Sequence, residues 1–241
     1  MCSLILYQSL YNVNADLDEP QKSFGDHTMP RPREFDETVA LEAAMECFWR
    51  RGYEATSMRD LTASMGLTAP SLYNTFGDKG ELFARALDRY LDRTTRDRLR
   101  RLEETLPPKA ALHRFFGEIV DHSVADRQRK GCFLVNSALE VAPHHAACRA
   151  VIAEQFGDIE AFFKRSIRGG QADATIPRAV DADDTARLLL GVLLGIRVLA
   201  RTKADRDLLA GMARPALALL DPPHRESTRR KSTRRKSGGK R

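Results

Sequence analysis

The sequence predicts an all-α fold, and two observations lead to this prediction. Apolar residues recur at spacings of three and four between residues 35 and 220, which is the period of one helix face. Val, Ile, Thr and aromatic residues never gather into the alternating runs typical of strands. The chain has 241 residues, 42% of them hydrophobic and 30% charged, which is enough to fill helical cores. We therefore expect two helical domains.

Breaks in this pattern predict the domain boundaries. Residues 1–29 show no helical period and precede Pro30, so they are either a disordered leader or a mis-assigned start. Residues 30–78 are expected to form a small N-terminal domain, and residues 79–221 a larger C-terminal one. Residues 222–241 carry a repeated Ser-Thr-Arg-Arg-Lys motif that cannot build a core, which predicts a disordered basic tail.

The net charge of +6 comes from this tail and not from the rest of the chain. Residues 224–241 hold nine Lys or Arg against one Glu, so the remaining residues are slightly acidic in balance. Residues 30–80 contain six basic and eight acidic side chains. The tail favours salt-dependent attraction to nucleic acid, but charge alone does not identify a DNA-binding segment in the first domain.

Helix signals divide the first domain into three helices. From Phe35 a helix runs to Gly52, with apolar positions at Val39, Ala43, Met45, Cys47, Phe48 and Trp49. A capping box from Ser57 to Asp60 opens a second, short helix that ends at Gly66. Thr68 caps a third helix with Pro70 in its first turn.

The third helix has a buried side and is followed by a long helix. Leu72 and Phe76 are four residues apart, so we expect both to lie on its buried face. Asp78 and Glu81 form a second capping box, which predicts a helix to about Leu106. Three short helices with a tight turn at residues 66–68 allow one helix to enter a DNA major groove.

Residues 38–83 read TVALEAAMECFWRRGYEATSMRDLTASMGLTAPSLYNTFGDKGELF. This segment resembles the signature of the TetR/AcrR family of transcriptional regulators. The resemblance implies a helix-turn-helix at residues 57–76 that docks on double-stranded operator DNA. It places Arg59 at the groove on the second helix and Lys79 at the DNA backbone. On the recognition helix it places Thr68, Ala69, Ser71, Leu72, Tyr73 and Asn74, with Tyr73 also at the backbone.

The second domain is expected to bind a ligand and a partner subunit. Amphipathic stretches lie near residues 109–129, 132–140, 144–168, 182–203 and 205–220. Phe115, Phe116 and Phe162 are candidates for the wall of a ligand cavity, although phenylalanine at helical spacing is ordinarily core. The resemblance implies a homodimer through the last two stretches. Residues 188–195 are apolar nearly all round and are expected to be buried on both sides.

Cys132 is the candidate sensing residue. It stands at the start of a predicted helix after Arg129 and Lys130, and both features favour a thiolate. The resemblance extends to TetR-type regulators that sense electrophiles or oxidants through a cysteine in this stretch. The alternative is a buried thiol that packs as a small hydrophobic group. His144, His145 and Cys148 lack the spacing of a metal site, so we expect no metal and no cofactor.

Other functional classes lack support in the sequence. There is no Gly-rich phosphate loop, HExxH, GxSxG or CxxC motif, so we expect neither an enzyme nor a disulfide framework. The longest apolar run, residues 188–200, is interrupted by Arg197 and falls short of the roughly 20 residues that cross a bilayer. We therefore expect a cytoplasmic protein with no membrane partner.

The resemblance predicts a repressor on a palindromic operator. A small-molecule or electrophile effector, or thiol modification, would release it. An activator of the same fold is an alternative, since the sequence does not determine the sign of regulation. A second alternative is a non-specific nucleic-acid-binding protein driven by the basic tail.

Overall fold

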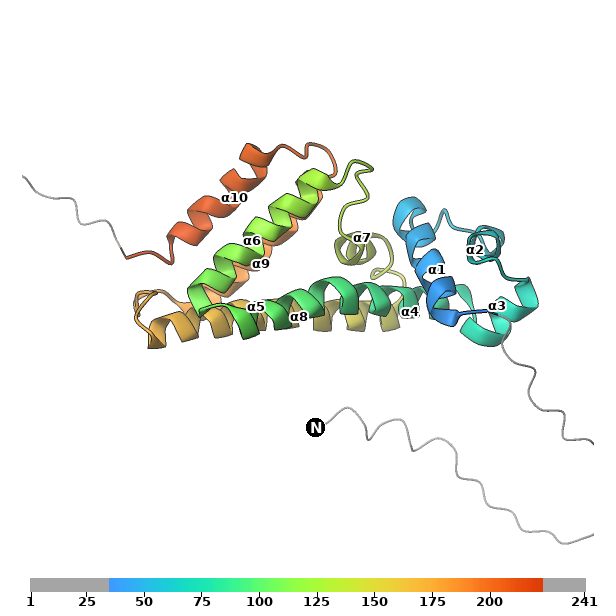
Figure 1. Ribbon diagram of the computed structural model, residues 1–241, viewed down its shortest axis with the longest axis horizontal. Helices are drawn as coiled ribbons and strands as arrows, with labels where there is room; N and C mark the ends of the chain where they lie inside the picture. The colour runs from blue at the N-terminus through green and yellow to red at the C-terminus, as the bar shows by residue number, and fades with distance from the viewer. Residues whose placement is uncertain (1–34, 223–241) are drawn as a thin grey trace, which may run out of the picture. The chain divides into compact units, whose positions relative to one another are not determined.

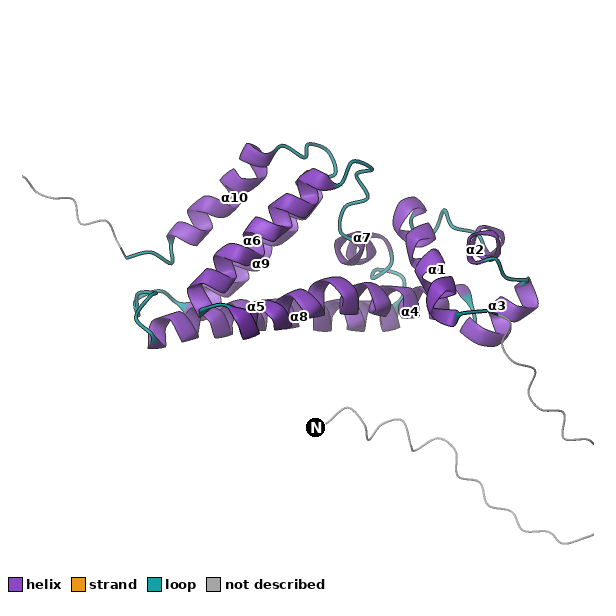
Figure 2. Ribbon diagram, viewed as in Figure 1, coloured by secondary structure: helices purple, strands orange, loops and turns teal. Residues whose placement is uncertain are grey.

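The computed structural model describes residues 35–222, and all regular structure in this range is helical (Figure 2). The predicted all-α class is confirmed. The segments expected to be a leader (residues 1–29) and most of the basic tail (residues 223–241) lie outside the described residues. The helices of Figure 1 are α1 (Glu37–Arg51), α2 (Met58–Met65), α3 (Ala69–Phe76), α4 (Lys79–Leu91), the π-helical turn η1 (Asp92–Arg96), α5 (Asp97–Thr105), α6 (Pro108–Ala125), α7 (Phe133–Glu140), α8 (Ala146–Ala172), α9 (Ala182–Leu199) and α10 (Arg206–Ala218).

The caps read from the sequence set the limits of α2, α3 and α4. The Ser57 hydroxyl accepts the Asp60 amide at 3.1 Å, and the Asp60 carboxylate accepts the Ser57 amide at 3.0 Å. The same reciprocal bonds join Asp78 and Glu81 at the start of α4. Gly66 ends α2 in the left-handed conformation, with φ of +66°, which only glycine adopts without strain.

The buried face of α1 differs from the expected one. Ala40, Ala44 and Phe48 are buried at a spacing of four, whereas Val39 is 64% exposed. Helix α1 packs against both α2 and α4, and small residues let these helices approach closely. Ala40 and Ala44 therefore fill the narrow contact of α1 with these helices, and the larger Val39 points to solvent.

The long helix expected from residue 78 to 106 is interrupted by a π-helical turn. In η1 the Asp97 amide donates to the Asp92 carbonyl, five residues back. Helices α4 and α5 run on from this turn without a break in the chain's helical path (Figure 1). Such turns occur often at functional sites, and Thr94 and Thr95 of η1 line a cavity described below.

The C-terminal helices form a second core. Helix α8 packs against α6 and α9, and α10 covers α6 and α9. The rings of Phe115, Phe116, Phe162 and Phe163 lie in its centre with centroids 5.1–5.7 Å apart. None of the helices between residues 35 and 222 has the length and apolar character needed to cross a bilayer.

In the single chain, residues 188–195 are buried on one side only, and the burial expected on the other side, against a partner subunit, stays a prediction. Leu189, Leu193 and Ile196 are buried against neighbouring helices, but Leu188 is 45% and Val198 is 48% exposed. Helix α9 therefore has one face in the core and one apolar face on the surface.

Candidate nucleic-acid interface and cavity

One side of helix α3 packs in the core of the small bundle, and the other side faces solvent. Leu72 and Phe76 are buried in the small bundle. Tyr73 is 50% exposed, and Thr68, Ala69 and Asn74 are exposed beside it, with Ser71 half-buried. Leu72 is therefore removed from the expected DNA contacts, because a fully buried side chain supports the helix and cannot reach a base.

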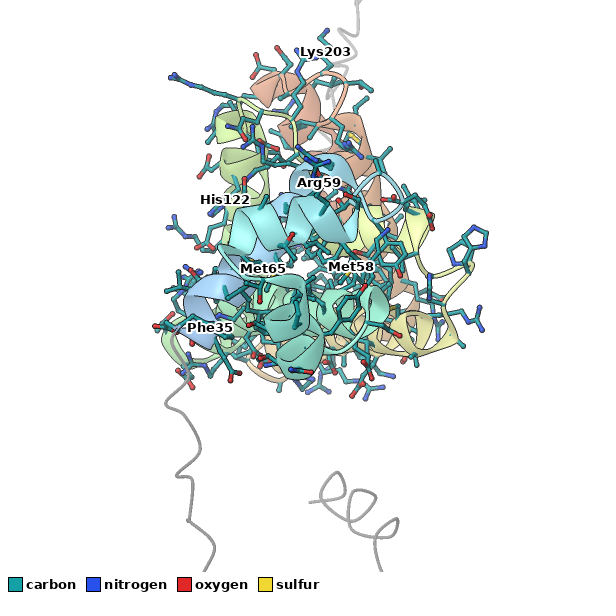
Figure 3. The ribbon with its side chains drawn as sticks, turned by 90° about the vertical axis from the view of Figure 1, so that its right-hand side faces the viewer. Phe35, Met58, Arg59, Met65, His122 and Lys203 are labelled. Atoms are coloured by element: carbon teal, nitrogen blue, oxygen red, sulfur yellow. The ribbon has the colours of Figure 1, made fainter. Side chains whose placement is uncertain are left out.

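The two expected cationic contacts differ in their surroundings. Arg59 is exposed on α2, which faces the viewer in Figure 3, and forms no ion pair among the described residues. Lys79 begins α4, and its ammonium lies 4.3 Å from the centre of the Tyr53 ring, so it is held against that ring. Arg51 pairs with Asp60, whose bonds to Ser57 and then to Arg51 lower its pKa to about 2.

The first turn of α3 offers few amide donors to a phosphate. Pro70 has no N–H, and the Ser71 amide donates to the Thr68 hydroxyl at 3.4 Å. The Ala69 amide remains as the available first-turn donor. Side chains, more than the helix terminus, must supply the contacts of α3.

A cavity of 420 Å³ lies between the π-helical turn and the C-terminal helices. Phe115, a candidate for its wall, lines this cavity, and so does Cys132, the candidate sensing residue. Phe116 and Phe162 do not contribute to its wall, because they pack in the aromatic core. Adjacent helical residues such as Phe115 and Phe116 point about 100° apart, so one wall can take only one of them.

Cys132 is buried, and the cations that precede it in the sequence have other partners. Its Sγ accepts the Tyr90 hydroxyl at 3.6 Å. Lys130 pairs with Glu46 at 2.9 Å, and Arg129 donates to the Thr202 carbonyl at 3.3 Å. The expected stabilisation of a thiolate by Arg129 and Lys130 is therefore not supported by their contacts. Burial raises the pKa of Tyr90 far above its usual range.

The cavity is joined to α1 through Trp49. Its indole N–H donates to the Gly131 carbonyl at 3.0 Å, and its ring lies 4.1 Å from the Lys130 ammonium and 5.0 Å from the Tyr90 ring. All four residues line the cavity. A change in the cavity can therefore reach the DNA-binding helices through a direct contact.

No group of three or more His, Cys, Asp or Glu side chains between residues 35 and 222 is arranged to hold a metal ion. Cys148 is buried, and burial raises the pKa of its thiol. The ring of His145 packs edge-on against Tyr53 with centroids 5.0 Å apart. These two residues therefore serve packing.

Comparisons with known proteins identify the family. The model described as "Bacterial regulatory proteins, tetR family" matches residues 40–86, and "Tetracyclin repressor-like, C-terminal domain" matches residues 108–215. The HTH-type transcriptional regulator YezE of Bacillus subtilis (strain 168) is 32% identical over 80% of this chain and 100% of its own. The chain belongs to the TetR family.

Two further TetR-family relatives cover both domains. The HTH-type transcriptional repressor ComR of Escherichia coli (strain K12) is 31% identical over 78% of this chain and 90% of its own. A cysteine mutant of the TetR family regulator CifR, solved in complex with 26-bp double-strand operator DNA, has a TM-score of 0.70. It is 34% identical over 79% of this chain and 100% of its own. This chain is thus a TetR-family DNA-binding transcriptional regulator and not an enzyme.

The sequence prediction missed most of the polar wall of this regulator's cavity. Arg98, Glu118 and Arg197 line it together with Trp49. Of these residues, only Arg197 could have been recognised from the sequence, because it is a charged residue within an apolar run. Arg98 and Glu118 lie in amphipathic helices where charged residues are common, so nothing in the sequence distinguished them.

Proposed function

We propose that this TetR-family protein is a homodimeric repressor in the bacterial cytoplasm. Asn74 and the exposed first-turn residues of α3 read a palindromic operator together with Arg59 at the groove, and Tyr73 and Lys79 contact the DNA backbone. A small molecule in the cavity, or modification of Cys132, releases it. The observation that carries this proposal is α3 itself, anchored by Leu72 and exposed along the opposite edge.

Two observations support repression with release. The relative ComR carries the name of a repressor, and the relative CifR was solved on operator DNA. In this chain, the Trp49 contact with Gly131 joins the cavity to α1, which packs on both α2 and α4. A ligand that binds one arrangement of these helices more tightly would shift the population of DNA-competent dimers.

The decisive experiment compares variants of α3 in gel shifts at matched salt, on operator DNA recovered by genomic selection. Tyr73→Ala is expected to weaken binding about tenfold, since one side-chain contact to DNA is worth about 1–3 kcal/mol. Its melting temperature should stay close to wild type because the ring is half in solvent. Unchanged binding by both Tyr73→Ala and Lys79→Ala would refute this interface.

The route of release is tested with the thiol reagent N-ethylmaleimide. Because Cys132 lines the cavity, a reagent that enters can reach its Sγ. Release by N-ethylmaleimide should be lost in Cys132→Ser and kept in Cys47→Ser, whose thiol lies on α1 outside the cavity wall. Full release of the Cys132→Ser protein would rule out modification at this position and assign the release to another thiol, such as Cys47 or Cys148.

A further inference from the structure

Two cations in the cavity wall pair with acids of α1. Arg93 donates to Glu42 at 2.7 Å, and Lys130 donates to Glu46 at 2.9 Å. Each of these pairs ties the wall to the DNA-binding domain. Glu46 neutralises Lys130, whereas Glu42 shares its one negative charge between Arg93 and Arg89, which pairs with it at 2.9 Å.

Two acids in the wall are also engaged. Asp97 pairs with Arg100 at 2.7 Å, and the Asp126 carboxylate accepts the Gly131 amide at 2.7 Å. The remaining acid is Glu118, which is 9% exposed.

Glu118 is surrounded by three arginines. Arg98 donates to it at 3.1 Å, Arg101 at 2.7 Å and Arg114 at 3.0 Å. Partial burial alone would raise the pKa of Glu118, but the hydrogen bonds from Arg101 and Arg98 outweigh it and hold the pKa at about 2. Arg101 and Arg114 reach solvent, whereas the Arg98 side chain is 11% exposed. Because Arg98 is the only nearly buried arginine of the three, the negative charge of Glu118 mainly compensates the charge of Arg98.

Arg197 of α9 has no such partner. Its guanidinium donates to the Ser123 hydroxyl at 3.2 Å, and no carboxylate of residues 35–222 forms an ion pair with it. Burial, and next the repulsion from Arg197, lower the pKa of Arg98. Both guanidiniums line the cavity, but Glu118 pairs with Arg98, so the positive charge of Arg197 has no carboxylate partner among residues 35–222.

Much of the remaining wall is apolar, beside the hydroxyls of Thr94, Thr95 and Ser123 and the ring of His122. Trp49, Phe115, Ile119, Phe156, Ile159 and Leu194 line it. A volume of 420 Å³ lies within the range of roughly 300–1,000 Å³ of small-molecule sites. A half-buried cation without a counter-ion, next to apolar walls, favours a ligand that brings one negative charge and a hydrophobic body.

We infer that the cavity binds an amphipathic monocarboxylate, with its carboxylate on the Arg197 guanidinium and its apolar part against the aromatic and aliphatic wall. This inference rests on the proposed function, since it names the class of the effector. Arg197 is then the residue that selects the charge of the ligand. A cationic head group would meet two guanidiniums, and a neutral one would leave Arg197 unpaired.

The test uses three ligands with the same tail: octanoate, octanamide and octylammonium. Trp49 is the chain's only tryptophan and lines the cavity, so its fluorescence reports binding to the full-length protein, with calorimetry as a second measurement. Octanoate should bind at least tenfold more tightly than octanamide, and octylammonium more weakly than either, because only the carboxylate forms a charge-assisted hydrogen bond with Arg197.

Arg197→Gln should weaken octanoate about tenfold and leave octanamide within twofold, so octanamide also reports that the cavity is intact. Arg197→Lys should restore part of the octanoate affinity. The matched control is Arg187→Gln on the same helix, since Arg187 is exposed and pairs with Asp184 outside the cavity wall. This control should bind octanoate and octanamide with wild-type affinity.

Equal affinity for octanoate and octanamide, unchanged octanoate affinity in Arg197→Gln, or no octanoate binding at millimolar concentration would each overturn the inference. The proposed function fails separately. If octanoate binds through Arg197 but neither it nor N-ethylmaleimide releases operator DNA, the carboxylate site stands and the release mechanism is wrong.

Discussion

Glu118 is the acid on which the arginines of the cavity depend, so its removal has a predictable cost. In Glu118→Gln the nearly buried Arg98 loses its only carboxylate partner among the described residues. We expect the free energy of unfolding at pH 7 to fall by about 1–3 kcal/mol, the usual cost of leaving a buried polar group poorly paired. Urea denaturation followed by circular dichroism measures this loss.

The pH dependence of that loss has a defined sign. The pKa of Glu118 is about 2 in the folded protein against its ordinary value of 4.5. A depressed pKa gives stability that is present above pH 4.5 and is lost as the pH falls towards 2. The difference between wild type and Glu118→Gln should therefore shrink between pH 5 and about pH 3. A difference that stays constant over this range would contradict the ionised cluster.

Single side chains also mark the limit of sequence-based prediction. The period of α3 predicted the burial of Leu72, while the family signature placed the same residue among DNA contacts. Leu72 is buried, so the prediction from the helical period is the correct one. Arg129 was assigned to Cys132 by its position in the chain, but its guanidinium donates to the carbonyl of Thr202, which is distant in sequence. A one-dimensional pattern does not contain those contacts.

At the level of elements, the glycines that end α2 and α3 should respond differently to alanine. Gly66 has φ of +66° and an added Cβ would meet nothing within 4 Å. Gly77 has φ of +73°, and its added Cβ would overlap the Glu81 carboxylate that caps α4. We expect Gly66→Ala to cost about 1 kcal/mol for backbone strain. Gly77→Ala should cost about 2 kcal/mol because the cap is lost as well.

Chemical denaturation of both variants checks this prediction, and equal losses would contradict it. Gly66→Asn is a useful control, since asparagine tolerates the left-handed conformation better than alanine. It should lose less stability than Gly66→Ala.

Most element boundaries could be predicted because they rest on local chemistry. The boxes at Ser57 and Asp78, the cap at Thr68 and the glycine at 66 each act within four residues. The π-helical turn at Asp92–Arg96 could not be predicted this way. It changes the hydrogen-bond partner by one residue without changing which residues look helical.

At the level of the whole molecule, Trp49 should carry the signal from cavity to α1. Trp49→Phe keeps a ring but removes the hydrogen bond to Gly131. We expect operator affinity within twofold of wild type. The octanoate concentration for half-release should rise about twofold to tenfold, the value of one neutral hydrogen bond. Anisotropy of labelled operator measures release, and calorimetry measures octanoate binding; a parallel loss of both would assign Trp49 to ligand binding alone.

The apolar surface of α9 and α10 bears on the proposed dimer. Leu188, Gly191 and Val198 follow one another on a face of α9, and Leu208 of α10 and Leu219, directly after α10, are exposed as well. An added Cβ at Gly191 would meet nothing within 4 Å in the single chain, whereas one at Gly195 would meet Met212 of α10 at 2.9 Å. Gly191 is therefore free for a partner, and Gly195 already serves packing within the chain.

This difference makes Gly191→Leu a sharp test of the dimer. In a monomer the change should raise stability slightly, because leucine favours a helix interior over glycine by up to about 1 kcal/mol. In a dimer through α9 the leucine side chain should clash with the partner, so sedimentation should show dissociation. Operator affinity should fall as well, because a palindromic site needs two linked recognition helices. Leu139→Asp places a charge on an exposed apolar residue of α7, away from this face, and should stay dimeric. An unchanged dimer of Gly191→Leu would exclude α9 from the interface and leave the exposed Leu188 and Val198 without a role in assembly.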